Sequence, residues 1–154
     1  MNNWTHYWRQ ATVEDIDLMN LSDPLDHSAS NMFLKRGVKQ GDRVYVISCF
    51  DGDFYVVGRL IVDQVVDQRT AQRSLPYEPW HAEDHILTRP GTRTPLRLNA
   101  TVPMKDVRRL QFISQRGVGY PKFTPKGVPD PQTFRGVRQI TDDTAKLFDR
   151  TLGL

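Results

Sequence analysis

Cysteine is nearly absent from this sequence, since Cys49 is the only one among 154 residues. This scarcity excludes a disulfide framework and any zinc site built on several cysteine thiolates. Cys49 lies within a β-branched and aromatic run. We expect a buried thiol among Val46, Ile47 and their neighbours rather than a reactive one, which would need a polar and exposed setting. We therefore expect no redox chemistry and no cofactor.

Long hydrophobic runs are also missing. No stretch approaches the ~20 apolar residues that a membrane-spanning helix needs, and Met1-Asn2-Asn3-Trp4 begins no apolar signal region. We expect a soluble, cytoplasmic protein that makes no membrane contact. The sequence contains no repeat, linker or low-complexity tract. It predicts a single domain over residues 1–154 that buries roughly two thirds of its unfolded surface.

Acidic residues are scarce in the second half of the chain. Residues 89–138 contain 11 Lys and Arg but only two acids, Asp106 and Asp130, whereas residues 1–88 contain 8 Lys and Arg against 13 Asp and Glu. The net charge of +3 therefore hides a local charge of +9. Cations clustered without interleaved carboxylates favour a polyanionic partner. A solvated basic face without a ligand is the alternative.

Two strands joined by a tight turn form the centre of the predicted fold. Gly37 is placed to end a helix in the left-handed conformation, and Gly41-Asp42 to form a turn before a strand over residues 43–50. Asp51-Gly52 predicts a hairpin to a second strand over residues 53–62. Apolar residues occupy both parities of both strands. This pattern suits a closed or strongly curved barrel with both faces covered.

Shorter elements, each bounded by capping or turn residues, surround this hairpin. Before the hairpin, the patterns predict a strand over 4–10, a helix over 12–16 capped by Thr12, a break at Asp23-Pro24 and a helix over 26–36. After it, they predict a polar segment over 63–74, a loop over 75–85 and an alternating strand over 92–102 with Leu96, Leu98, Ala100 and Val102 inward. A short element over 107–113, a basic aromatic loop over 117–127 and a helix from a Thr141 cap to Gly153 complete the chain.

Several of these residues have both a structural and a functional interpretation. Trp4 and Trp8 share one strand face with His6 and either pack in the core or form a π-surface at a pocket wall. The polar residues Ser28, Ser30 and Asn31 either cap a helix or present amides and hydroxyls to an anion or a base edge. Trp80 stands among prolines and either covers the core or flanks a ligand cavity.

His81 and His85 stand four residues apart, so two zinc patterns must be considered. The metalloprotease pattern needs Glu directly after the first His, where this chain has Ala82. The base-deaminase pattern needs a downstream Pro-Cys-x-x-Cys, and Cys49 lies upstream. Both patterns fail. We expect no metal here and a structural role, or none, for these two histidines.

Several stretches resemble the EVE domain of the PUA-like superfamily, which is related to the YTH and ASCH domains. They are Tyr7-Trp8, the run from Ser30-Asn31-Met32-Phe33-Leu34 into Val38-Lys39-Gln40-Gly41-Asp42-Arg43-Val44, the stretch Val57-Gly58-Arg59-Leu60, and the ending Thr133-Phe134-Arg135-Gly136-Val137-Arg138-Gln139-Ile140-Thr141 with its helix. The resemblance spans most of the chain. It implies an α+β fold in which a PUA-like small curved β-barrel is flanked by helices.

EVE domains and the similar YTH domains are known as readers that accept a modified base, often flipped, in an aromatic-lined pocket. The resemblance matches the following residues to that pocket: Tyr7 and Trp8 to the first-strand aromatic segment, Ser30 and Asn31 to the polar start of the helix, Ser48 and Phe50 to the far end of the strand after Gly-Asp, and Trp80 to the cage tryptophan of YTH domains. The family's usual Trp-x-Gly is replaced by Pro24-Leu25-Asp26-His27. The resemblance therefore does not specify the ligand.

Together, the residues and the resemblance predict a non-catalytic module that binds DNA or RNA and reads a modified base. The predicted base pocket consists of Trp4, Tyr7, Trp8, Ser28, Ser30, Asn31, Ser48, Phe50 and Trp80. The predicted phosphate-binding residues are Arg93, Arg97, Arg108, Arg109, Arg116, Lys122 and Lys126. Stacking of about 1–3 kcal/mol per base would offset an unstacking cost of a few kcal/mol. Whether a partner effector enzyme acts on the bound nucleic acid stays open.

Two other classes of function are alternatives. An ASCH-like nuclease or small hydrolase, acting on nucleic acid or nucleosides, needs an acid or base beside cations. Glu14, Asp42, Lys39 and Arg43 are available but form no recognisable constellation, and the Gly-x-Lys-x-x-Glu-x-Arg pattern of ASCH domains is missing. A protein-interaction module would predict an exposed apolar patch instead of a basic one.

Overall fold

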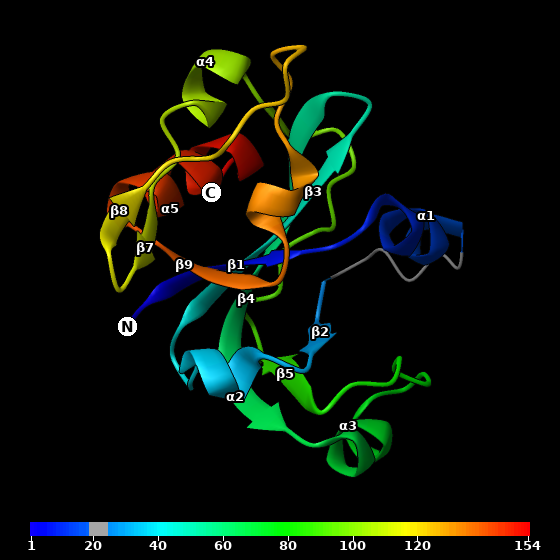
Figure 1. Ribbon diagram of the computed structural model, residues 1–154. Coiled ribbons are helices and arrows are strands. Elements are labelled where there is room, and N and C mark those ends of the chain that lie inside the picture. Colours follow the sequence, from blue (N-terminus) through cyan, green and yellow to red (C-terminus); the bar gives the residue numbers. More distant parts are fainter. Residues whose placement is uncertain (19–24) are drawn as a thin grey trace.

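The computed structural model describes residues 1–18 and 25–154 and shows an α+β fold built on one mixed sheet (Figure 1). The strands are β1 (Asn3–Tyr7), β2 (His27–Ser30), β3 (Arg43–Phe50), β4 (Asp53–Val66), β5 (Asp84–Thr88), β6 (Thr101–Val102), β7 (Phe112–Ser114), β8 (Gly117–Gly119) and β9 (Val137–Ile140). The helices are α1 (Gln10–Leu18), α2 (Phe33–Arg36), α3 (Gln68–Ser74), α4 (Met104–Val107) and α5 (Asp142–Leu152), with a 3-10 turn, η1 (Pro131–Phe134). The expected break at Asp23-Pro24 lies outside the described residues.

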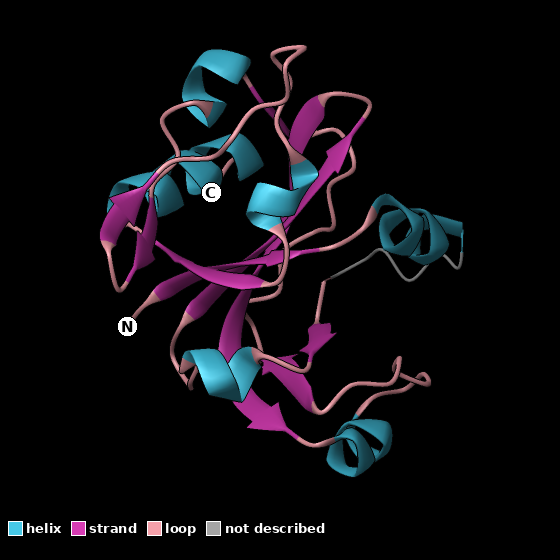
Figure 2. Ribbon diagram, viewed as in Figure 1, coloured by secondary structure: helices cyan, strands magenta, loops and turns pink. Residues whose placement is uncertain are grey.

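The sheet is open rather than closed. Its strand order is β2-β5-β4-β3-β1-β9-β7-β8, with β6 beside the start of β4. Within the described ranges, the two outermost strands, β2 and β8, pair with their inner neighbours and not with each other. The long strand β4 runs through the molecule and links the end that carries α4 and α5 to the end that carries α2 and α3 (Figure 2). The expected closed barrel is therefore wrong.

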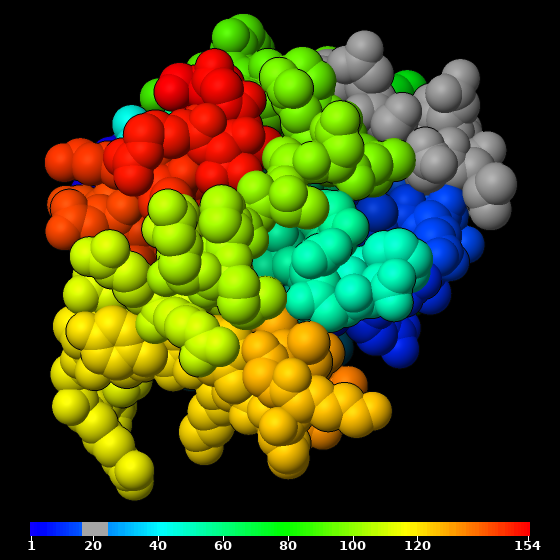
Figure 3. Space-filling view, turned by 90° about the horizontal axis from the view of Figure 1, so that it is seen from above, coloured from blue at the N-terminus to red at the C-terminus, as the bar shows by residue number. Residues whose placement is uncertain are grey.

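The hairpin at the centre of the sheet follows the sequence prediction. Phe50 pairs with Asp53 across a two-residue turn, in which Asp51 and Gly52 both have positive φ, 53° and 83°. Two successive positive φ values give the twist that a two-residue hairpin needs, and they explain the Asp-Gly sequence. Gly37 ends α2 with φ 93°, as predicted. In the view from above, the tip of this hairpin lies between α1 and the later segments (Figure 3).

Alternate residues of β3 contribute to two separate cores. Val44 and Val46 pack in the tryptophan core, which we define as the buried cluster around Trp4 and Trp8. Tyr45 and Ile47 pack in the phenylalanine core, defined as the cluster around Phe54, Phe112, Phe134 and Phe148. An open sheet covered on both faces thus requires apolar residues at both parities, the same pattern that a barrel would give.

The C-terminal helix also agrees with the sequence, whereas the predicted strand over 4–10 is confirmed only to Tyr7, because Gln10 already begins α1. β1 runs parallel to β3 and antiparallel to β9, with Trp4 opposite Val44. Helix α5 begins after Thr141, whose Oγ1 accepts a hydrogen bond from the Thr144 amide at 3.3 Å, and it ends at Gly153 with φ 77°. None of the helices in the described ranges has the length and apolar character to span a membrane.

The predicted helix over residues 26–36 is wrong for its first half. Residues 27–30 form β2, which pairs with β5, and only one helical turn follows as α2. His27, Ser28 and Ala29 are all buried. Pairing with a strand more than fifty residues away overrides the local helical pattern, and hydrogen bonds to other elements engage Ser28 Oγ and His27 Nε2.

The predicted strand over residues 92–102 is also mostly wrong. Only Thr101–Val102 pair with β4, while Thr94 makes a single bridge to Leu25. Ala100 and Val102 are buried as expected, but Leu98 is 39% exposed. Pro95 supplies no backbone N–H for a ladder, which agrees with the interruption.

Four smaller boundaries also differ from the sequence prediction. Thr12 lies inside α1 rather than at its cap, residues 63–74 are the end of β4 followed by α3, the loop over 75–85 ends in β5, and the region 107–113 is divided between α4 and β7.

Asp42 is the polar anchor of the tryptophan core. It is fully buried, and its carboxylate accepts hydrogen bonds from the Asn2 amide at 2.9 Å, the Trp4 indole at 2.9 Å and the Lys39 amide at 3.1 Å. These contacts join the start of β1, the turn before β3 and β3 itself. Hydrogen bonds to a charged acceptor are among the stronger ones in proteins.

Asp42→Ala should lower the free energy of unfolding by at least about 3 kcal/mol, because three N–H donors lose a charged acceptor. Chemical denaturation followed by circular dichroism measures this loss. Asp53→Ala, at the exposed start of β4, is the matched control and should change stability by less than about 0.5 kcal/mol. Equal effects of the two substitutions would contradict the anchoring role of Asp42.

Cys49 is half-buried and packs against the phenylalanine core, so it is less enclosed than the sequence suggests. Burial raises the pKa of its thiol to about 12. Very little thiolate then forms near neutral pH, and the thiolate is the reactive form. We expect slow reaction with a thiol reagent in the native protein and fast reaction after unfolding in denaturant. Rapid labelling of the native protein would show that this strand end opens.

Candidate functional site

The nine residues of the predicted base pocket do not come together in one place. Trp8, Ser28 and Trp80 meet at an aromatic cluster, and Ser48 and Phe50 line a separate cavity. The other four, Trp4, Tyr7, Ser30 and Asn31, belong to neither. The molecule therefore offers two candidate sites, each built from only part of the predicted set.

The aromatic cluster consists of Trp8, His27, Tyr77 and Trp80. These rings come from the end of β1, from β2 and from the loop between α3 and β5. Trp80 meets the ring of Trp8 edge-on at 5.7 Å and that of His27 at 5.0 Å, and Tyr77 lies 6.2 Å from His27. Trp8 is buried and Trp80 is half-buried. The loop with Tyr77 and Trp80 thus forms the outer cover of the cluster.

Polar groups are interleaved with these rings. The Trp8 indole donates to Ser28 Oγ at 3.0 Å, and Ser28 Oγ lies 2.6 Å from His6 Nδ1. Because the serine oxygen accepts from Trp8, its own hydrogen is free to be donated to His6. The Tyr77 hydroxyl donates to Asp26 at 2.8 Å and holds the covering loop to β2. His27 was missed by the sequence analysis, since its partners belong to distant elements.

The histidines of this region are neutral near physiological pH. Burial lowers the pKa of His6 to about 4 and that of His27 to about 3. Burial is also the largest cause of the lowered pKa of His85, which contacts His27 Nε2 through its Nδ1 at 2.8 Å. A neutral imidazole donates from one nitrogen and accepts at the other, so the site can make directional hydrogen bonds without bearing charge.

The hollow beside the aromatic cluster is nearly filled. It has a volume of about 10 Å³, which is room for about one water molecule. Its lining is Trp8, Ile16, Leu25, Asp26, His27, Tyr77, Trp80 and Leu96. A larger ligand requires the covering side chains, Tyr77 and Trp80, to move outward.

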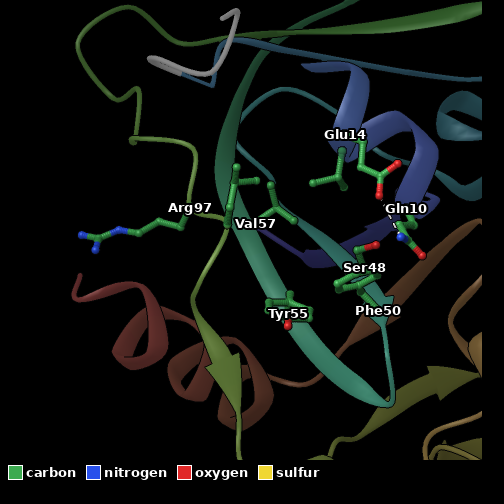
Figure 4. A pocket seen from close by; sticks show the side chains of 9 residues that line it. Gln10, Glu14, Ser48, Phe50, Tyr55, Val57 and Arg97 are labelled. Carbon is green, nitrogen blue, oxygen red and sulfur yellow. Dashed lines mark hydrogen bonds between the residues drawn. The ribbon is translucent and has the colours of Figure 1, made fainter. Parts of the chain in front are cut away.

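The second site is a cavity of about 200 Å³ beside the hairpin (Figure 4). Its lining is Gln10, Val13 and Glu14 of α1, Ser48 and Phe50 of β3, Tyr55 and Val57 of β4, and Arg97 and Leu98 of the loop between β5 and β6. Phe50 is 42% exposed, and Ser48 Oγ donates to the Trp8 carbonyl at 2.7 Å. We call this space the hairpin cavity. Tyr55 pairs with Ser48 across the hairpin, so the Asp-Gly turn could have placed it from the sequence.

The two hollows share two walls. Helix α1 bounds both, through Val13 at the hairpin cavity and Ile16 at the aromatic cluster. Residues 96–98 also bound both, since Leu98 lines the cavity and Leu96 lines the cluster. The Trp8 main chain connects them as well, through its hydrogen bond from Ser48. They therefore lie next to one another beneath the same two segments.

The remaining four predicted pocket residues have structural contacts. Trp4 is buried and bonded to Asp42, and Tyr7 packs against the phenylalanine core. Ser30 Oγ accepts from the Met32 amide at 3.1 Å, and Asn31 Oδ1 accepts from the Glu83 amide at 2.8 Å.

The expected anion site at the start of α2 is also occupied from within the protein. The carboxylate of Asp84 accepts a hydrogen bond from the Leu34 amide at 3.0 Å. An incoming anion would have to displace this carboxylate.

All seven predicted phosphate-binding residues are exposed, and none takes part in a salt bridge within the described ranges. Arg93 and Arg97 lie in the loop before β6, Arg108 and Arg109 after α4, Arg116 in the β7–β8 turn, and Lys122 and Lys126 in the loop that follows β8. The view from above shows α4, the β7–β8 hairpin, the loop after it and the tip of the β3–β4 hairpin on one face of the molecule (Figure 3). Arg97 points away from the hairpin cavity (Figure 4).

The residues named for a nuclease or a zinc site are separated. Asp42 is buried and accepts hydrogen bonds from three N–H donors. Glu14 accepts a hydrogen bond from Gln10 in the hairpin cavity, and Arg43 lies 3.8 Å from Asp149. His81 is exposed while His85 is buried. In the part of the chain that the structure describes, no group of three or more His, Cys, Asp or Glu side chains is placed to hold a metal ion.

The chain matches no protein-family model, no curated protein and no solved structure. Its function must therefore be argued from the geometry of the two hollows and from the charge that surrounds them.

Proposed function

We propose that this protein binds single-stranded or locally unpaired nucleic acid without catalysing a reaction, and that the aromatic cluster accepts an extruded base. One observation carries the proposal. The segment from Arg93 to Leu98 lines both hollows and carries two exposed arginines that make no salt bridge with any residue that the structure describes. Aromatic rings beside unpaired cations are the combination that binds bases and phosphates together.

Entry of a base requires the part of the loop that carries Tyr77 and Trp80 to swing outward, while Ala82 keeps its contacts with Gln68 and His85. Tyr77 and Trp80 are its anchors, through the hydrogen bond to Asp26 and the edge contacts with Trp8 and His27. Once they move, Trp8 and His27 remain as fixed walls, because both are buried, His27 on β2 and Trp8 directly after β1. Stacking of the base contributes about 1–3 kcal/mol and phosphate contacts the remainder.

The hairpin cavity is placed to hold a neighbouring nucleotide. Phe50 and Tyr55 offer ring faces, with their centroids 6.5 Å apart, and Ser48 and Gln10 line the wall opposite the loop. Because this cavity is already open, it requires no rearrangement. Two adjacent bases, one at each hollow, would fit under the two shared walls.

We include in the proposal that the chain is an EVE-like member of the PUA-like superfamily and reads a modified base. The feature that agrees with this part of the proposal is the α+β class, with helices beside a β-sheet. The binding role is preferred to a nuclease because N–H donors engage the oxygens of Asp42, the Gln10 amide engages Glu14, and Arg97 points away from the cavity that Glu14 lines (Figure 4).

Binding should depend strongly on salt. The affinity for a single-stranded oligonucleotide should fall with a log–log slope near 0.7 for each phosphate neutralised. Changing Arg93 and Arg97 together to Ala should reduce that slope by about 1.4 and weaken binding to all sequences alike. Fluorescence anisotropy over a salt series measures both.

The control for this double variant is Lys35→Ala with Lys39→Ala, which removes the same charge near α2. It should leave the slope nearly unchanged. A flat salt response of the unmodified protein would contradict the basic surface as the phosphate site.

Trp80→Ala should weaken binding by about 1–3 kcal/mol and remove discrimination between modified and plain oligonucleotides. Because Trp80 is half-buried, its loss should also destabilise the fold, by less than the about 3–5 kcal/mol of a fully buried tryptophan. Binding is therefore measured well below the melting temperature, which calorimetry supplies for the same sample.

Phe50→Ala is the matched variant at the hairpin cavity. It should weaken binding but keep the discrimination between modified and plain oligonucleotides. The melting temperature should change little, since Phe50 is 42% exposed. If Trp80→Ala keeps discrimination and Phe50→Ala removes it, the base is read in the hairpin cavity instead.

A further inference from the structure

Two backbone groups of Ala82 fix the hydrogen-bond direction of a buried side-chain relay. The Ala82 amide donates to Gln68 Oε1 at 3.0 Å, so this atom must be the amide oxygen and not the nitrogen. The Ala82 carbonyl lies 3.2 Å from His85 Nε2 and can only accept, so Nε2 must carry the proton. His85 Nε2 also donates to Gln68 Oε1. Both contacts of Nε2 require the His85 tautomer that carries its proton on Nε2.

This tautomer determines the state of His27. With its proton on Nε2, neutral His85 has only a lone pair at Nδ1, which lies 2.8 Å from His27 Nε2. His27 must therefore donate from Nε2, and in the neutral ring its Nδ1 is left as a bare acceptor. The rings of His27 and His85 are nearly parallel, with an interplanar angle of 19° and centroids 5.1 Å apart.

The acceptor on His27 has no partner within the described part of the chain. Nδ1 is buried and unbonded, while the residue as a whole is only 2% exposed. The Trp8 indole and Ser28 bond each other, and Asp26 accepts from Tyr77. A buried acceptor without a donor is unfavourable and rare in folded proteins. The ring of His27 lines the hollow of the aromatic cluster.

We propose that His27 Nδ1 is a fixed hydrogen-bond acceptor of the base site and that it selects bases with an amino group at the position of the adenine 6-amino or cytosine 4-amino group. This inference rests on the proposed function and adds the class of base. Adenine and cytosine offer an amino N–H donor at the edge where guanine and thymine offer oxygen acceptors. An acceptor that cannot be switched to a donor favours the first pair and leaves the second with two opposed lone pairs.

The relay also explains why selection would be strict. Reversal of His27 would require Nδ1 to be protonated and Nε2 to accept, so His85 Nδ1 would have to become a donor. His85 would then lose the proton that its Nε2 shares with Gln68 and with the Ala82 carbonyl. Three residues outside the aromatic cluster, Ala82, Gln68 of α3 and His85 of β5, therefore hold the acceptor in place.

The first test uses the protein alone. Long-range proton–nitrogen correlation NMR reports which imidazole nitrogens are protonated. We expect the two nitrogens of His27 to show a protonated Nε2 and a bare Nδ1, and His85 to show the same tautomer. Protonation of His27 at Nδ1 would overturn the inference whatever the protein binds.

The second test compares two oligonucleotides. One is a thymine tract that contains a single adenine. In the other, this adenine is replaced by purine, which lacks the amino group. The purine probe should bind about three- to tenfold more weakly, the effect of one lost hydrogen bond. His27→Phe should remove this preference, whereas His81→Phe at an exposed position should keep it. Measurable binding with equal affinity for both probes would overturn the inference and leave the proposed function standing. Absence of binding to either would overturn both.

Discussion

A single buried carboxylate holds together the parts of the chain that the rest of the structure depends on. Asp42 receives hydrogen bonds from the chain start, from the indole of Trp4 and from the turn before β3. A carboxylate in a buried position is tolerated only when such donors compensate its lost hydration. The parallel pairing of β1 with β3 is thereby fixed at its first residues, and the remaining strands are added on either side.

The geometry of both hollows follows from that parallel pair. β1 continues past its last pairing, so that the Trp8 amide donates to the Ile47 carbonyl at 2.8 Å and Ser48 donates back to the Trp8 carbonyl. These bonds place the indole of Trp8 against Ser28 of β2 and direct the chain into α1. Trp8 is therefore a wall of the aromatic cluster, while its main chain borders the hairpin cavity.

Elements that depend on local chemistry were predictable from the sequence. The Asp51-Gly52 turn and the Gly37 helix end need a positive φ, which few residue types adopt, and the Thr141 cap needs a side-chain oxygen that accepts from the Thr144 amide. β2 and β5 were not predictable in the same way, because β2 is a strand only through its pairing with β5, and β5 only through its pairing with β2 and β4. The inferred barrel failed because an open sheet covered on both faces has the same residue pattern.

The candidate site was predictable only in part. Trp80 stood out because a tryptophan among prolines has few local partners, and Ser28 because it belongs with Ser30 and Asn31 to a polar group suited to an anion or a base edge. His27 gave no signal, since its role depends on Gln68, Ala82 and His85, which reach it only in the folded chain. Ser30 and Asn31 were overinterpreted, because short polar residues that build turns resemble residues that bind ligands.

The central claim is that nucleic acid binds at the aromatic cluster, and the three tryptophans provide one direct measurement of it. Their indole N–H resonances can be followed by NMR while a single-stranded oligonucleotide is added. Trp80 covers the cluster, Trp8 forms its inner wall, and Trp4 is bonded to Asp42 away from both hollows. The account predicts that the resonances of Trp80 and Trp8 shift on saturation while that of Trp4 stays in place. Binding that leaves the Trp80 and Trp8 resonances unmoved would contradict it.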